Sequence, residues 1–136
     1  MSGPFTAAMQ HLASQVEILT GGMLVWKDAD AGLRRTQPRS VAIQCHPACL
    51  AVKRRPGGHD RCVAWCSFHS GRSGGSGTCH AGMMQWRWAV HADGGLLGYV
   101  SIGPFARGAA GLPQPPSSAV AEACGSLVVA AIAGLA

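Results

Sequence analysis

The stretch QWRWAVHADGGLLGYVSI (residues 85–102) decides the predicted fold of this chain. In its first half Trp86, Trp88 and Val90 alternate with Gln, Arg and Ala, so the three larger side chains share one face of a strand. The Asp-Gly-Gly at its centre suits a tight turn, because these residues tolerate the left-handed backbone. The stretch therefore predicts an antiparallel hairpin, whose return strand ends before Pro104.

Other elements can be placed outward from this hairpin. Residues 4–20 carry an apolar stripe at four- and three-residue steps, typical of a helix with one face on the core or at a dimer seam. Glycines 21 and 22 end that helix. The remaining expected elements are a strand at 23–27, a turn at 28–32, a helix from Pro47 to about Arg55, a second helix after residue 59 or 60 that carries residues 62–69, a Gly/Ser-rich loop at 70–77, and a last helix at 119–133 capped by Ser117 or Ser118. This order predicts an α+β fold, with few antiparallel strands and helices on one face.

Length and composition favour one compact domain spanning residues 1–136, in which 111–136 are a proline-rich connector and the terminal helix. The chain is 48% hydrophobic and 12% charged, which excludes a disordered tail and a coiled coil. Its net charge of +5 comes from scattered residues that do not coincide with stacked aromatics, so nucleic-acid binding is not expected. No secretory signal stands at residues 1–20, and the apolar run at 127–136 is short for a membrane span, so we expect a cytoplasmic protein.

Five of the six cysteines lie within 35 residues, with histidines close by. Cys45 and Cys49 are four residues apart, as are Cys62 and Cys66, and on a helix this step places both sulfurs on one face. Thiolates with imidazoles suit zinc or an iron–sulfur cluster, although the two-residue gaps of zinc ribbons are missing. The alternative is that each cysteine is a small core side chain, which is the expectation for Cys124.

Several motifs follow one another in a specific order: Cys49, then Pro56-Gly57-Gly58, then Arg61-Cys62, then Cys79-His80-Ala81-Gly82, then the hairpin, and Gly103-Pro104-Phe105. In this order the chain resembles the PocR sensory domain over roughly residues 5–110. The resemblance implies a PAS/GAF-like antiparallel sheet with flanking helices and the binding of a small molecule. Relatives are linked to sensing simple hydrocarbon derivatives, beside a DNA-binding or signalling domain.

The resemblance also implies which residues form the site. Cys49, Cys62 and Cys79 would hold a metal, as zinc or an iron–sulfur cluster, with a fourth ligand from Cys45, Cys66, His80 or a small molecule. The candidates for the wall of a ligand pocket are Trp86, Trp88, Tyr99 and Phe105. Tryptophans on a hairpin also serve as plain core, and that reading stays open. The chain departs from the family by lacking a proline in the strand after the Cys-His-Ala-Gly motif and by Gly-Pro-Phe in place of Gly-Gln-Phe.

The leading hypothesis is therefore a free-standing bacterial sensory module for signal transduction or transcription regulation. It would bind a small molecule at a thiolate-held metal, form a possible homodimer, and act through a protein partner that supplies the output. One alternative is an iron–sulfur or redox-sensing protein, in which an exposed cluster or thiol responds to oxidants. A zinc-dependent enzyme is the third hypothesis, although its acid/base partner would come from few carboxylates or from a histidine.

Overall fold

The computed structural model describes residues 2–28, 46–62, 76–109 and 111–135. The described elements, in chain order, are α1 (Ser2–Thr20), β1 (Met23–Asp28), α3 (Pro47–Arg54), β2 (Ser76–Thr78), β3 (Met84–Ala92), β4 (Gly95–Phe105) and α5 (Ser118–Leu135). All strand pairs are antiparallel, and the four strands follow the order β1-β4-β3-β2. This architecture confirms the α+β class. The expected turn after Asp28 and the continuation of a helix beyond Cys62 lie outside the described residues.

The central hairpin of β3 and β4 is confirmed. Its turn consists of Asp93 and Gly94, with φ of 52° and 77°, the left-handed values that a two-residue hairpin turn requires. The return strand is longer than predicted, because β4 runs through Pro104 to Phe105. Proline is tolerated there because the register with β3 shifts just beside it, between Met84 and Trp86.

One expected loop is in part a strand. Residues 76–78 form β2, which pairs with Met84 to Trp86 of β3, whereas the Gly/Ser content predicted a loop through residue 77. Backbone groups make the bonds of a sheet, so a segment with small side chains can still add an edge strand when a partner lies alongside.

The first helix, α1, ends as its sequence predicts. The amide of Gly21 donates to the carbonyl of Glu17 at 2.7 Å, and Gly21 takes a φ of 79°. The Thr20 hydroxyl donates to the Val16 carbonyl at 2.8 Å and accepts from the amide of Gly22 at 3.0 Å. Together these bonds satisfy the last turn and send the chain directly into β1.

The apolar stripe of α1 is only partly a core stripe. Met9 and Val16 are fully buried and Leu12 is half-buried, but Leu19 is 61% exposed. The interpretation in which the whole stripe faces the core is therefore wrong at Leu19, and the dimer seam stays a prediction.

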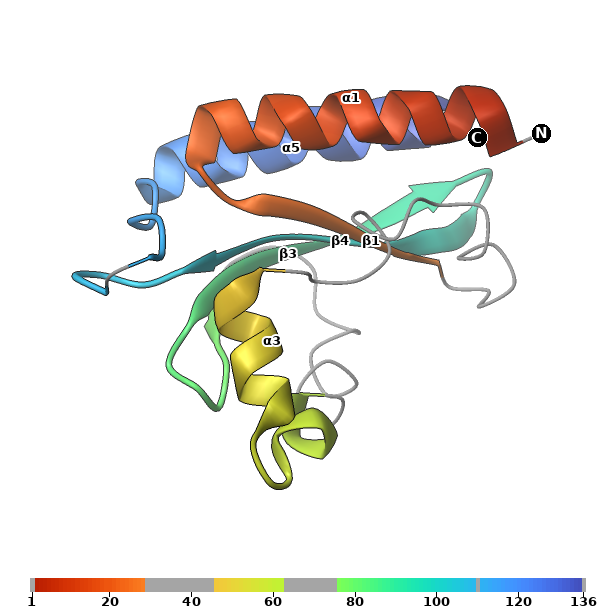
Figure 1. Ribbon diagram of the computed structural model, residues 1–136. Helices are drawn as coiled ribbons and strands as arrows, with labels where there is room; N and C mark the ends of the chain where they lie inside the picture. Colours follow the sequence, from red (N-terminus) through yellow and green to blue (C-terminus); the bar gives the residue numbers. More distant parts are fainter. Residues whose placement is uncertain (1, 29–45, 63–75, 110, 136) are drawn as a thin grey trace.

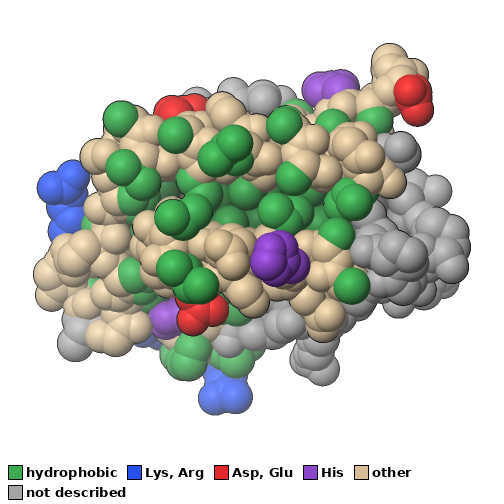
Figure 2. Space-filling model, turned by 90° about the horizontal axis from the view of Figure 1, so that it is seen from above, with side chains coloured by type: hydrophobic (Ala, Val, Ile, Leu, Met, Phe, Trp, Pro, Cys, Tyr) green, Lys and Arg blue, Asp and Glu red, His purple; other side chains and the backbone are tan. Residues whose placement is uncertain are grey.

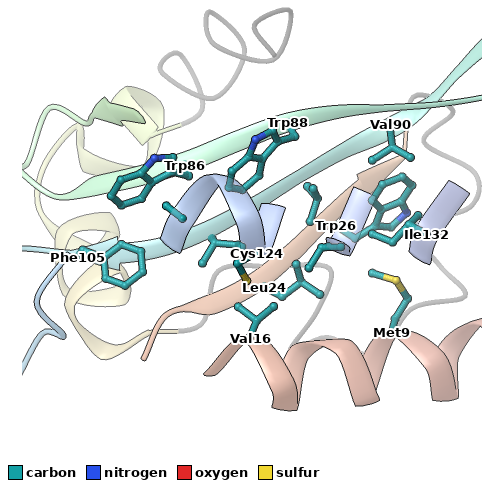
Figure 3. Close-up of a cluster of buried hydrophobic side chains, with 14 residues drawn as sticks. Met9, Val16, Leu24, Trp26, Trp86, Trp88, Val90, Phe105, Cys124 and Ile132 are labelled. Atoms are coloured by element: carbon teal, nitrogen blue, oxygen red, sulfur yellow. The ribbon is translucent and has the colours of Figure 1, made fainter. Parts of the chain in front are cut away.

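The helices α1 and α5 cover the same face of the sheet (Figure 1). The main core lies between this helical layer and the sheet (Figure 3), and its largest fully buried side chains include Trp26, Phe105, Met9, Leu24 and Ile132. Helix α5 begins at the predicted cap, where the Ser117 hydroxyl accepts from the amide of Val120 at 3.2 Å.

Glycine lets α5 approach the sheet closely. At Gly125 the backbone of α5 lies directly on the indole ring of Trp88, where a Cβ atom would overlap the ring. The same device operates within the sheet, where a Cβ atom on Gly98 would overlap the ring of Trp26 and the carbonyl oxygen of Lys27. Both glycines make room for a large aromatic ring in the core.

The sequence predicted that all helices lie on one face of the sheet, and this prediction is wrong. Helix α3 lies on the side of the sheet away from α1 and α5 (Figure 1). It packs on a second, smaller hydrophobic cluster formed by Cys49, Val52 and Met83. Three cysteines of the predicted site, Cys49, Cys62 and Cys79, gather at this cluster.

Candidate thiol site

Helix α3 presents Cys49 to the interior. The ring Nδ1 of His46 accepts from the amide of Ala48 at 3.1 Å and caps the helix, and Pro47 occupies the first turn. With the start fixed in this way, Cys49 and Val52, three positions apart, share the buried face.

The Pro-Gly-Gly segment turns the chain from α3 to the next helical residues, 58–62. The amide of Gly58 donates to the carbonyl of Arg55 at 2.8 Å, and the amide of Arg61 donates to the carbonyl of Gly57 at 3.1 Å. Gly57 has a φ of 72°, and a Cβ atom on Gly58 would collide with the carbonyl oxygen of Val52. Only glycine fits this tight reversal, which brings half-buried Cys62 back toward α3.

The Cys-His-Ala-Gly motif is the turn that joins β2 to β3. The amide of Cys79 donates to the carbonyl of Met83 at 2.8 Å, and the amide of Gly82 donates to the carbonyl of Cys79 at 2.9 Å. Gly82 has a φ of 81°, a left-handed value that explains the glycine at this position. The turn holds Cys79 half-buried and leaves the His80 ring exposed.

These three segments meet at one place. Cys62 and Cys79 both pack against the small cluster of Cys49, Val52 and Met83. The Sγ atom of Cys62 lies 3.2 Å from Nε2 of His80, although the two residues are 18 positions apart. We call Cys49, Cys62, Cys79 and His80 the thiol cluster. The three cysteines that the resemblance selected are thus brought together by α3, the helical residues 58–62 and the β2–β3 turn.

The pair of Cys62 and His80 has a definite chemistry. A neutral imidazole can accept the thiol proton at Nε2, and a protonated imidazole stabilises the thiolate by a charge-assisted hydrogen bond. Thiolates are the nucleophilic and metal-binding form of cysteine. Because Cys62 is only half-buried and His80 is exposed, solvent and small solutes reach the pair.

The types of donor atom in the thiol cluster suit a soft metal ion. Thiolate and imidazole are the ligands that zinc prefers. Within the described ranges, however, no three His, Cys, Asp or Glu side chains are placed so that they could hold a metal ion together. Cys45 and Cys66, the other candidate ligands, lie outside the described residues. In the arrangement described, the Cys62 Sγ and His80 Nε2 atoms lie within hydrogen-bonding distance of each other.

The remaining described cysteine, Cys124, belongs elsewhere. It is 5% exposed and lies on the buried face of α5, in the main core (Figure 3), as the sequence predicted. Burial raises the pKa of the Cys124 thiol above its ordinary value, because the apolar surroundings disfavour the thiolate. None of the four described cysteines forms a disulfide.

The four residues proposed to line a ligand pocket do not share one surface. Trp86, Trp88 and Phe105 are buried in the main core, where Trp86 and Phe105 make an edge-to-face contact with ring centroids 5.6 Å apart. Tyr99 pairs with Lys27 and Ala89 and, being one position from buried Val100, points to the opposite face of the sheet. The three core residues have the packing role that was the open alternative for the tryptophans, and Tyr99 is half-buried on the face away from α1 and α5.

Val52 and Met83 also belong to this site, and their positions in the sequence are a signal for it. Val52 follows Cys49 by three positions on the same short helix, and Met83 directly follows the motif glycine, so both could have been placed beside the cysteines. They form the hydrophobic floor on which the thiols pack.

Comparison with protein-family models, with curated proteins and with solved structures finds no match for this chain. The fold defines an α+β protein with one antiparallel sheet and two sets of helices. The likeness to the PocR sensory domain therefore rests on the motifs in the sequence alone.

Proposed function

We propose that the chain is a small sensory module that captures a soft metal ion, or a small molecule through such an ion, at the thiol cluster. The observation that carries the proposal is the 3.2 Å contact between Cys62 Sγ and His80 Nε2 beside Cys49 and Cys79. Cysteines that served only as core would not need an imidazole at the sulfur atom. The reducing cytoplasm is the compartment in which such thiols stay available.

Each residue of the cluster would have a distinct part in binding. Cys62 and His80 provide the first two donors in their described positions. Cys79 adjoins His80 and packs on the same small cluster as Cys62, so a small movement of the β2–β3 turn would bring in a third donor. Cys49 or one of the cysteines outside the described residues would complete the set. A bound zinc ion with an open position would polarise a small oxygen-containing ligand.

The same contacts offer a route from binding to output. The helical residues 58–62, which carry Cys62, follow α3 in the chain. His80 lies in the turn before β3, which the bond from the Cys79 amide to the Met83 carbonyl closes. An ion that joins Cys62 to His80 would favour the arrangement in which α3 is held against the sheet. A ligand shifts such an equilibrium only by its difference in affinity for the two arrangements. A protein partner that contacts α3 would then distinguish the bound state from the free state.

Anaerobic titration of the reduced protein with Co²⁺ tests the proposal, because thiolate-to-cobalt absorption reports sulfur ligands directly. We expect one Co²⁺ per chain, displaced by Zn²⁺, with affinity lowered at least about tenfold in Cys62→Ser and His80→Ala. Cys124→Ala is the matched control, since it removes a thiol from the main core and should leave the affinity unchanged. Absence of sulfur-to-metal absorption with every thiol titratable, or equal affinity in all variants, would refute the metal site.

A thiol-based redox sensor is the second candidate, favoured by the half-buried Cys62 beside an imidazole. A Cys62 thiolate would attack a hydroperoxide, forming the sulfenic acid and releasing water or an alcohol; a second thiol of the cluster would then form a disulfide and release water. Peroxide should then produce a Cys62-dependent disulfide by mass spectrometry. An air-sensitive brown protein containing iron and sulfide would instead indicate an iron–sulfur cluster.

A further inference from the structure

We infer that the outer surface of α1 and α5 is the contact surface for a second copy of this chain. The surface, called here the outer helical face, is defined by five exposed apolar side chains: Ile18, Leu19, Val120, Leu127 and Leu135. Ile18 is 76% exposed and Leu127 is 71% exposed, so large aliphatic groups stand in water on both helices. This inference is independent of the thiol cluster, which lies on the other side of the sheet.

The exposed side chains form one surface rather than scattered points. The two helices contact each other and lie side by side over the same face of the sheet. Figure 2 shows hydrophobic side chains along both helices and in the furrow between them. An apolar surface that extends over two adjacent elements of a soluble domain marks an interaction site.

The charges on the two helices favour a protein over a lipid surface. Neither α1 nor α5 contains a Lys or Arg, so all 11 basic residues lie outside the two helices. The charged side chains that the two helices do carry are Glu17 and Glu122, both exposed. Helices that lie on membranes depend on basic residues to attract anionic lipid, and here the two carboxylates would be repelled.

A transmembrane role for α5 is also disfavoured. By length and composition this helix is apolar enough to cross a membrane. It is nevertheless attached to the sheet through Ala121, Cys124, Gly125, Val128 and Ile132, which are buried in the main core. Insertion into a bilayer would expose the matching side chains of the sheet, including Trp88, to water.

The outer surface of the two helices is large enough for a small dimer interface. A helix of 18 or 19 residues is about 27 Å long, and two adjacent helices present a strip about 20 Å wide, or about 540 Å² in projection. Accessible area exceeds its projection, so each copy can bury roughly 600–800 Å², near the lower end of specific interfaces. Small exposed residues on α5, among them Ala123, Ser126 and Ala130, let a facing helix approach closely. In a dimer with a two-fold axis, each copy would contribute the same outer helical face, so no such face would stay free to bind a third copy.

The test is the mass of the full chain in solution, by sedimentation equilibrium over a wide range of concentration. Wild-type protein should be a dimer at micromolar concentration, and Leu127→Glu and Ile18→Glu should each raise the dissociation constant at least about a hundredfold, because each buries two carboxylates in the interface. Both positions are exposed in the single chain, so neither variant should alter the circular dichroism spectrum. Leu96→Glu is the matched control: it adds the same charge at an exposed leucine of β4 and should not change the dissociation constant.

Three outcomes would overturn the inference. The first is a wild-type chain that stays monomeric at every concentration. The second is a dimer whose dissociation constant is unchanged in both Leu127→Glu and Ile18→Glu. The third is a monomer that co-sediments with vesicles of neutral and anionic phospholipid, with binding lost in the same two variants, which would assign the surface to lipid. None of these outcomes bears on Co²⁺ binding, so the two proposals can fail separately.

Discussion

Replacing Gly125 with alanine should loosen the attachment of α5 to the sheet. The added Cβ would overlap three atoms of the Trp88 indole, and Cη2, the most distant of the three, would lie only 2.7 Å away. Trp88 is 6% exposed and held between the sheet and α5, so the ring has no space into which it can turn. Overpacking of this kind costs up to about 3 kcal/mol. Alanine recovers about 1 kcal/mol through its higher helix propensity.

The expected net loss is therefore about 2 kcal/mol in the free energy of unfolding, or roughly 6–10 °C in Tm for a domain of this size. Urea denaturation followed by circular dichroism measures the loss. Gly134→Ala is the control within the same helix, because nothing lies within 4 Å of its added Cβ. That variant should be as stable as wild-type or up to about 1 kcal/mol more stable.

A double-mutant cycle locates the effect at the predicted contact. Trp88→Phe removes the part of the ring that the new methyl group would strike, so Gly125→Ala should cost less in the Trp88→Phe background than in wild-type. If Gly125→Ala proves as stable as wild-type, or if its cost is the same in both backgrounds, the close approach of α5 to Trp88 is wrong.

Three further predictions concern the thiols and the hairpin turn. Iodoacetamide should modify Cys62 in the native protein well before buried Cys124, as followed by mass spectrometry of peptides; equal rates would contradict the described burial. Because burial raises the pKa of Cys124, its protonated thiol stabilises the fold below the unfolded-state pKa, and this contribution is lost as pH rises through the folded-state pKa. Alkaline pH should thus lower the unfolding free energy more in wild-type than in Cys124→Ala, a difference that denaturation at several pH values would detect. Gly94→Ala should cost about 1 kcal/mol by the same assay, from its φ of 77° alone, since its Cβ would meet no neighbour; an unchanged stability would argue against the left-handed turn.

The parts of the fold that the sequence predicts are those fixed by local chemistry. Alternation and the Asp-Gly turn identify the hairpin, and the glycines after Thr20 identify the end of α1. Strand β2 escaped prediction because its pairing with β3 depends on backbone groups of another segment. Periodicity also predicts which side chains of a strand share one face, but it does not predict which face of the sheet a helix covers. For this reason Trp86 and Trp88 could be placed together, but their position under α5 could not be derived.

The candidate site shows the same division. Spacing alone paired Cys62 with Cys66 and Cys45 with Cys49, whereas the described structure groups Cys49, Cys62 and Cys79 from three separate segments. That grouping was expected only from the resemblance of the motifs. The contact of Cys62 with His80 depends on two tight reversals, at Gly58 and Gly82, whose combined direction no local pattern specifies.

The position of β1 in the sheet has a consequence for the synthesis of this protein on the ribosome. Met23 pairs with Gly103, a residue synthesised 80 positions later, and β1 has no other partner strand in the described sheet. At about 5–20 residues per second, β1 is synthesised about 4–16 s before the strand β4 with which it pairs. Leu24 and Trp26 are almost completely buried in the folded protein, but in the unfinished chain they are apolar side chains without the strand on which they pack. Nascent-chain chaperones should find their binding segment there.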